Sequence, residues 1–243
     1  MNARTNARTN GSLYDTPLGE ADGGVSAFVH SWLPAPPARV LEIGSGDGKL
    51  ALALAEEGWR VTAVDPRAPE GEPFIRGAVE DLDASEHGPF DAAVAVLSLH
   101  HLPDIEVALD KVRPLLRPGA VFIVDDFGKE ELEDEATAAY SFYQRLALLL
   151  GGYCPVKHSA GAVLDGDSFE GWRSRLSRHW EHIDKGRTVL SALEARFEGR
   201  EFASGPFLVR DGLDPGLEPL ERKLIEAGGI RPIGFRWVGV AQG

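Results

Sequence analysis

Two histidines and several acids stand at the ends of apolar runs, where side chains can reach a ligand. His100 and His101 follow the run "AVAVLSL", Asp125 and Asp126 follow "AVFIV", and Asp65 ends "RVTAV". A histidine can take up a proton near neutral pH, and a carboxylate can orient that histidine or accept hydrogen bonds from a ligand. These residue types predict a site that binds a polar ligand and can remove a proton from it.

A glycine-rich loop follows another apolar run, which lies earlier in the chain, in the stretch "VLEIGSGDGKL" at residues 40–50. In a dinucleotide-binding loop, G-x-G-x-x-G follows a strand and places a pyrophosphate on a helix N-terminus. Gly44 and Gly46 fit that pattern, but Gly48 comes one position early and Lys49 stands where the third glycine belongs. The loop therefore favours a ligand without a pyrophosphate. A nicotinamide dinucleotide stays an alternative, since Asp65 also suits such a site.

The elements that must position these residues alternate between strand and helix. Strand-like runs without polar alternation are typical of a parallel sheet buried on both faces, with helices between its strands. We expect helices at 26–33, 50–57 and 105–116, and strands at 39–43, 60–65, 73–77, 90–97 and 120–126. The first part of the chain is therefore predicted to form a doubly wound α/β sheet.

The second part of the chain has a different pattern. Residues 129–150 predict one long helix with acidic first turns, and residues 151–186 have weak periodicity. Regular elements then return as helix 189–197, strand 207–211, helix 219–229 and strand 231–241. We predict a mostly parallel seven-stranded sheet, with residues 128–185 as a helical cap between strands five and six.

Composition limits the classes of protein that fit. The 243 residues carry a formal charge of -13, which disfavours binding to the phosphate backbone of a nucleic acid. Cys154 is the only cysteine, so no intramolecular disulfide is expected, and the sequence has no apolar stretch of membrane-spanning length. We expect a cytoplasmic protein with a disordered tail at 1–12 and one domain at 13–243. The oligomeric state stays open.

Four segments, in order and with matching spacing, carry a resemblance to a known family. They are "LEIGSGDG", "VTAVD", "AVLSLHHLPD" and "LRPGAVFIVDDF". The chain resembles the class I S-adenosylmethionine-dependent methyltransferases, which have a Rossmann-like fold, an E-x-G-x-G-x-G loop and an "HHL" segment after the fourth strand. The resemblance covers residues 38–127, and residues 186–243 by topology alone. It implies S-adenosylmethionine as the cofactor.

The resemblance also implies a cofactor site. Glu42 would act near the methionine end through the loop or a water, and Asp65 would accept hydrogen bonds from the ribose hydroxyls. Many relatives carry an aspartate for the adenine amine where this chain has Ala78, so Glu80 or Asp81 is expected to supply that carboxylate. The cofactor-binding residues expected on this basis are Glu42, Gly44, Ser45, Gly46, Asp65, Pro66, Val79, Glu80 and Leu97.

The candidate catalytic residues are His100, His101 and Asp126. If the acceptor is a hydroxyl, one group at the strand ends must take its proton; a histidine does this better than an ionised aspartate, and we favour His100 with Asp126 as its orienting partner. Either histidine could instead be a packing residue, and no metal site is expected.

Trp172 and Trp180 either line an acceptor pocket or form the core of the cap. We expect methylation of oxygen or nitrogen on a small molecule, against two alternatives: a non-catalytic S-adenosylmethionine-binding protein and an NAD(P)-dependent oxidoreductase.

Overall fold

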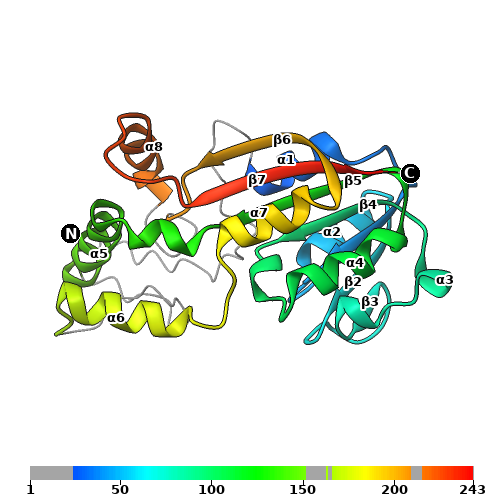
Figure 1. Cartoon of the computed structure of the whole chain (residues 1–243), viewed down its shortest axis with the longest axis horizontal. Coiled ribbons are helices and arrows are strands. Elements are labelled where there is room, and N and C mark those ends of the chain that lie inside the picture. Colours follow the sequence, from blue (N-terminus) through cyan, green and yellow to red (C-terminus); the bar gives the residue numbers. More distant parts are fainter. Residues whose placement is uncertain (1–23, 152–162, 164–165, 209–214, 243) are drawn as a thin grey trace, which may run out of the picture.

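The structure is a computed structural model that describes residues 24–151, 163, 166–208 and 215–242. The predicted tail at 1–12 and Cys154 lie outside these described residues. Within them, a long sheet extends across the molecule and a group of helices gathers at one of its ends (Figure 1).

Seven strands form one sheet in the order β3-β2-β1-β4-β5-β7-β6. The strands are β1 (Arg39–Ile43), β2 (Arg60–Asp65), β3 (Phe74–Arg76), β4 (Phe90–Val96), β5 (Leu116–Phe127), β6 (Phe197–Gly205) and β7 (Gly234–Ala241). Strands β1 to β5 pair in parallel, and β7 is antiparallel to both of its neighbours. The predicted seven-stranded, mostly parallel α/β sheet is confirmed. The carboxyl ends of β1, β2, β4 and β5 lie at one edge, where ligands bind in such folds.

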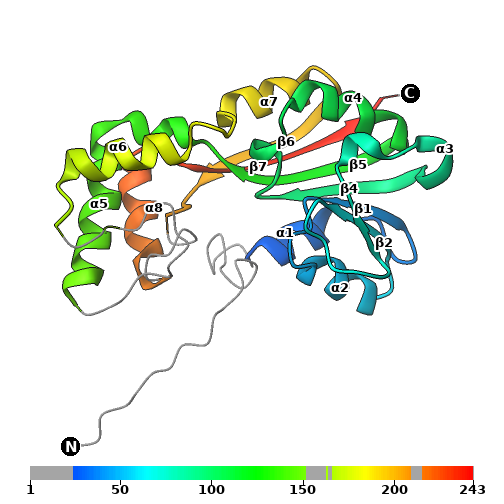
Figure 2. The same ribbon diagram turned by 90° about the horizontal axis from the view of Figure 1, so that it is seen from below.

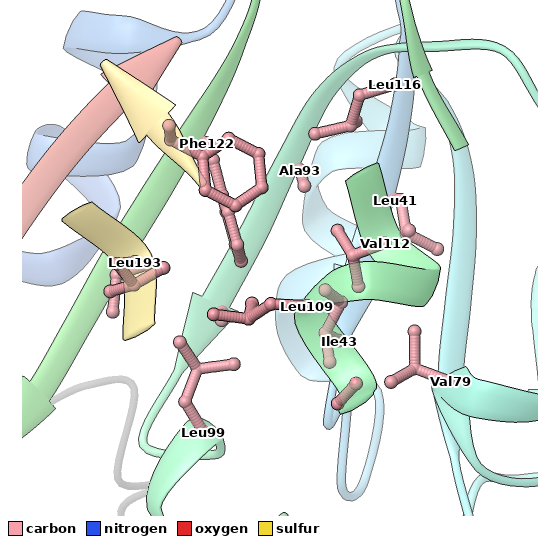
Figure 3. Packing of buried hydrophobic residues seen from close by; sticks show 14 of the residues in the cluster. Leu41, Ile43, Val79, Ala93, Leu99, Leu109, Val112, Leu116, Phe122 and Leu193 are labelled. Carbon is pink, nitrogen blue, oxygen red and sulfur yellow. The ribbon is translucent and has the colours of Figure 1, made fainter. Parts of the chain in front are cut away.

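Helices cover both faces of the sheet. Figure 2 shows α1 (Gly24–Trp32) and α2 (Lys49–Glu56) on one face, and α3 (Ala84–His87), α4 (Ile105–Leu115) and α7 (Gly186–Glu194) on the other. Alternate residues of β1 serve the two faces: Val40 packs with α1 and α2, whereas Leu41 packs with α4 (Figure 3). Because both faces are buried, the strands have continuous apolar sequences, as expected for a parallel sheet.

The cap has its own hydrophobic core. It contains the 3-10 helix η5 (Lys129–Glu133), α5 (Glu135–Leu150) and α6 (Phe169–His179), and α8 (Glu218–Glu226) lies beside α5 in both views (Figures 1 and 2). Phe142 of α5 and Trp172 of α6 are buried in this core. Phe207, Leu208 and Ile233 also belong to it, so residues beyond the predicted range 128–185 contribute to the cap's packing.

The predicted long helix at 129–150 is interrupted. Asp134 adopts an extended conformation and caps α5 by accepting a hydrogen bond from Thr137 N, so the preceding residues form the separate η5 turn. Asp134 therefore acts as an N-cap, a role in which aspartate is favoured. Glu130, expected near the positive end of one long helix, is instead buried against a different element.

The prediction of strand six was wrong in position. The strand is β6 at Phe197–Gly205, whereas Phe207 and Leu208 of the predicted strand 207–211 lie outside it and residues 209–211 are not described. As an edge strand, β6 is exposed at nearly every position, so it lacks the apolar pattern that marks the inner strands. Phe207 and Leu208 are apolar because they pack into the cap.

Candidate active site

The glycine loop connects β1 to α2, and its glycines are required by packing. Gly44 has a φ of +75°, and a Cβ there would lie 2.2 Å from the Cβ of Ser98 at the end of β4. Gly48, with a φ of +82°, immediately precedes α2, and its Cβ would meet the Phe74 ring at 2.3 Å. Both positions combine a left-handed backbone with a close neighbour, which only glycine permits. The early third glycine therefore allows the end of the loop to lie against the Phe74 ring of β3.

A cavity of about 460 Å³ opens at the carboxyl ends of β1, β2 and β4. Of the nine residues expected to bind a cofactor, Gly44, Gly46, Asp65, Pro66, Val79, Glu80 and Leu97 line it, and Glu42 and Ser45 do not. The prediction from sequence missed several lining residues, among them Arg67, Ser98 and Pro103. Arg67 and Ser98 each stand two residues after a strand end, which is the signal that could have identified them, whereas Pro103 lies beyond η4 (Leu99–His101).

Asp65, at the end of β2, holds the glycine loop in place by a hydrogen bond. Its carboxylate accepts hydrogen bonds from the main-chain N–H of Gly46 at 3.0 Å and of Arg67 at 2.7 Å. The side chain is mostly buried, yet it lines the cavity. A carboxylate has acceptor capacity for more than two hydrogen bonds, so Asp65 can still accept from a ligand hydroxyl.

Three buried polar atoms around this cavity have no hydrogen-bond partner in the described part of the chain. They are Glu42 Oε2, Ser45 Oγ and Glu80 Oε2. Burial raises the pKa of Glu42 to about 8, and the nearby Asp47 and Asp65 act in the same direction, against a hydrogen bond from the Ala51 main chain. Buried polar atoms normally find partners, so these atoms suit a ligand with donors of its own. An amino acid joined to a nucleoside has such donors.

Leu97, directly after β4, has an unusual backbone conformation and contacts two hydrophobic cores. Its φ of 50° is the only positive value outside glycine among the described residues. Strained residues of this kind persist only where surrounding contacts hold them, and they are common at functional sites. Here the Leu97 N–H donates to Asp125 O at 2.8 Å, and its side chain packs against both the cap core and the α1/α2 core.

The structure brings His100 and Asp126 together from neighbouring strand ends. His100 Nδ1 lies 2.6 Å from Asp126 Oδ1, and both side chains are buried. Asp126 Oδ1 also accepts from the Phe127 N–H at 2.9 Å, which fixes the carboxylate. His100 does not line the cavity, so its imidazole lies behind the surface that a ligand would contact.

His101 does line the cavity, beside His100. The two imidazole rings have centroids 4.1 Å apart. Burial, followed by the neighbouring His100, lowers the pKa of His101 to about 4, although Asp126 and Asp65 act in the opposite direction. His101 is therefore neutral near pH 7 and has a free lone pair for a proton, but the lowered pKa makes it a weaker base than an ordinary histidine. Of the candidate bases His100, His101 and Asp126, His101 is the one that a ligand in the cavity can touch.

The remaining candidates divide between the cap and the surface. Trp172 is fully buried in the cap core and Trp180 is half-buried, with its ring 5.6 Å from that of Phe127; both also line a second cavity of about 760 Å³ in the cap, so neither alternative is excluded. Asp81, the other candidate for the adenine amine, is exposed and does not line the cavity.

Among the described residues, no cluster of three metal-ligating side chains occurs. No helix in those ranges has the length and apolar character needed to cross a membrane.

The fold and the cavity define a class of protein: an α/β domain that binds a nucleoside-containing ligand at the strand ends, where the sheet order reverses. A family model described as "Methyltransferase domain" matches residues 20–203. The chain belongs to this family, and it is a class I S-adenosylmethionine-dependent methyltransferase. Of the three unpartnered atoms, Glu80 Oε2 belongs to a residue that lines the cavity, which fits a ligand with hydrogen-bond donors, and the cofactor is S-adenosylmethionine.

Similar proteins carry more specific names. A ubiquinone biosynthesis O-methyltransferase of Xylella fastidiosa (strain 9a5c) is 31% identical over 179 residues, covering 61% of this chain and 71% of that protein. A protein of the same name from Xanthomonas campestris pv. campestris (strain B100) is 33% identical over 116 residues, covering 42% of this chain and 48% of that protein.

Solved structures share the fold. A Burkholderia thailandensis 1,6-didemethyltoxoflavin-N1-methyltransferase, with its namesake ligand and S-adenosylhomocysteine bound, has a TM-score of 0.54 at 20% identity, covering 94% of this chain and 80% of that chain. A geranyl diphosphate C-methyltransferase from Streptomyces coelicolor A3(2) has a TM-score of 0.53 at 13% identity, covering 89% of this chain and 79% of that chain. The two names place the methyl group on different atoms, so the fold alone does not fix the acceptor.

Proposed function

We propose that this methyltransferase methylates a hydroxyl oxygen of a small molecule, with His101 as the general base. The observation that carries the proposal is the placement of a neutral imidazole, His101, on the cavity wall, next to the buried His100–Asp126 pair. A hydroxyl has a proton to lose when it is methylated, and an uncharged histidine at the acceptor can take it. The O-methyltransferase names of the similar curated proteins support the same acceptor atom.

S-adenosylmethionine supplies an electrophilic methyl carbon on a sulfonium, so the protein's main task is alignment. For the cofactor, we propose that Asp65 holds the ribose hydroxyls, Glu42 the ammonium, and Glu80 the adenine amine. Asp65 and Glu80 line the cavity, and the Glu42 carboxyl lies near Asp47 of the loop and the main chain of Ala51. Gly44, Ser45, Gly46, Pro66, Val79 and Leu97 complete the cofactor side by shape and by main-chain contacts.

For the acceptor side, we propose distinct roles for the two histidines. His101 faces the acceptor and receives its proton. His100 lies behind it and is held by Asp126 through a hydrogen bond of 2.6 Å, so the pair fixes the position of His101. The Asp126 carboxylate favours the charge that His101 gains, whereas His100 opposes it. The expectation that His100 itself is the base is thereby modified: His100 becomes a positioning residue, with Asp126 as its anchor.

The acceptor atom can be tested with matched compounds. Purified enzyme is incubated with methyl-labelled S-adenosylmethionine and hydroxylated aromatic acids, in parallel with counterparts that carry an amino group at the same ring position. We expect label in the hydroxyl series alone. Label in the amino series alone would overturn O-methylation. S-adenosylhomocysteine binding without transfer to any acceptor in a broad metabolite screen would favour a non-catalytic binding protein.

A further inference from the structure

The cap returns to the sheet through a short run, residues 183–187, which we call the return segment. It connects α6 with α7 and lies against the ends of β5 and η4 (Leu99–His101). Asp184 N–H donates to the main-chain carbonyl of His100 at 2.8 Å. Through this hydrogen bond, any displacement of the return segment acts directly on the backbone that carries both histidines.

A buried glutamate holds this segment in place. Glu130 of η5 accepts a hydrogen bond from Gly186 N–H on Oε2 and another from Arg187 N–H on Oε1, each at 2.9 Å. Each carboxylate oxygen therefore satisfies one of the free N–H groups in the first turn of α7. The negative charge also lies at the positive end of that helix dipole. Glu130 is buried, so water competes little for these contacts.

Gly128 and Lys129, which follow β5, make two further contacts with the return segment and the residues before it. Gly186 lies directly on Gly128, and a Cβ at position 186 would come within 2.7 Å of the Gly128 Cα. Lys129 Nζ donates to the main-chain carbonyls of Trp180 and Ile183, just before and within the return segment. The residues that follow β5 thus contact the return segment at several points, while Asp126, at the end of the same strand, holds His100.

We propose that Glu130 is a positioning residue for methyl transfer, because its carboxylate fastens the return segment to the end of β5 and thereby fixes the His100–His101 backbone beside the acceptor. The inference rests on the proposed roles of the two histidines. A displacement of about 1 Å in a reacting group can cost up to roughly a hundredfold in rate, so a fastening residue outside the cavity can control transfer.

The test compares Glu130→Gln with Glu133→Gln in the full-length enzyme. Glutamine keeps the size of the side chain but has only one acceptor oxygen, so one of the two N–H groups loses its partner. Glu133 is the matched control, because it stands on the same 3-10 helix and pairs with Lys185 of the return segment, but through an exposed side chain. For Glu130→Gln we expect kcat to fall by about tenfold with a higher KM for the acceptor, as misalignment would produce.

The same variant should bind S-adenosylhomocysteine within about twofold of the parent, because the cofactor side is built from other strand ends. Glu133→Gln should leave kcat, KM and cofactor affinity near the parental values. Should Glu130→Gln fold poorly, Glu130→Asp keeps the charge but shortens the reach, and it should show the same division between transfer and cofactor binding. Parental kcat in folded Glu130 variants would overturn the proposal, as would an equal loss of transfer and cofactor binding.

A second readout needs no acceptor and therefore separates this inference from the proposed reaction. With S-adenosylhomocysteine bound, hydrogen exchange at the Asp184, Gly186 and Arg187 amides and the NMR titration of the His101 ring are followed in both variants. We expect faster exchange and a shifted His101 titration in Glu130→Gln alone. Unchanged exchange and titration would overturn the fastening role, even in an enzyme that methylates oxygen. A changed titration in an enzyme that methylates only nitrogen would refute the proposed function and leave the fastening contact intact.

Discussion

The two sides of the cavity are held in different ways. On the side that we propose for the cofactor, Gly44, Gly46 and Asp65 stand at or just after the ends of the neighbouring strands β1 and β2, and Asp65 holds Gly46 by a hydrogen bond. On the acceptor side, His100 depends on Asp126, 26 residues away, and on Asp184 in the return segment. The first side is therefore a property of the sheet, whereas the second exists only when β4, β5 and the cap are assembled together.

This difference predicts that substitutions on one side should leave the other side nearly intact. Sites without shared partners usually respond independently, and sites in one network do not. Variants on each side therefore show whether the cofactor side and the acceptor side are separable.

The largest effect is expected for Gly44→Val. Its side chain would overlap Ser98 at the end of β4 and would have to adopt a left-handed backbone, so folding and cofactor binding should both fail. Gly71→Val is the matched control: Gly71 also has a positive φ, of +88°, but nothing lies within 4 Å of its Cβ position. Thermal unfolding and calorimetry with S-adenosylhomocysteine would check this. Parental affinity in a folded Gly44→Val protein would refute the packing role of the loop.

Trp172→Ala should act on the cap. The ring is fully buried between α5 and α6, and removal of such a side chain typically costs about 3–5 kcal/mol. Because the cap does not line the cofactor cavity, affinity for S-adenosylhomocysteine in the folded variant should stay near the parental value. Leu150→Ala, at an exposed position, should change neither quantity. A parallel loss of acceptor and cofactor binding in folded Trp172→Ala would show that the two sides are coupled.

Asp65→Ala should weaken S-adenosylhomocysteine binding by about 1.5–3 kcal/mol, the range for hydrogen bonds to a charged group. The residue also accepts from Gly46 and Arg67, so some of this loss would come from the loop. Asp47→Ala, which removes an exposed carboxylate in the same loop, serves as the control. Binding by Asp65→Ala at parental strength would mean that the ribose is held elsewhere.

The smallest effect is a pH dependence of cofactor binding through Glu42. The pKa of this buried carboxyl is raised to about 8, so it is protonated in the free protein below that pH. If it pairs with the ligand ammonium, binding releases that proton, and affinity should rise between pH 6 and pH 7.5 by at most about tenfold per pH unit. Calorimetry at several pH values would measure this. Glu42→Gln should abolish the slope, and a slope that persists in this variant would exclude Glu42 as its source.

The stability of the free protein should show the opposite trend. A carboxyl whose pKa is raised on folding binds more protons in the native state than in the unfolded state between its unfolded and folded pKa values. The contribution of Glu42 to stability is therefore present at acidic pH and lost as the pH rises toward 8. Unfolding of Glu42→Gln, measured across this window without ligand, should lack that decline.

The cofactor side could be predicted from sequence because its signals are local. The run that ends at Asp65 and the glycines after β1 mark strand ends directly, and most of the residues expected at the cofactor site line the cavity. The purpose of Gly44 and Gly48 could not be predicted, since it depends on Ser98 and Phe74, which are distant in the sequence. Glu42, in β1, and Ser45, in the loop, were also expected at this site, but neither lines the cavity.

The cap and β6 were less predictable for a physical reason. β6 is an exposed edge strand, so its sequence lacks the apolar run that identified β4 and β5. Glu130 resembled an ordinary acid in the first turn of a helix, because nothing local reveals that it caps α7, 56 residues further along the chain. His101 and His100 are adjacent in sequence, and only the assembled cap and strand ends determine which of them faces the cavity.

The central claim is that one side of the cavity binds the cofactor while His101 on the other side serves the acceptor. It is tested most directly by the methyl-transfer rate of His101→Ala at saturating S-adenosylmethionine, with S-adenosylhomocysteine affinity measured on the same protein. We predict a rate lower by roughly 10²- to 10⁴-fold, as for loss of a general base, with cofactor affinity almost unchanged. A rate within about threefold of the parent would contradict the account, because alignment alone would then drive the transfer.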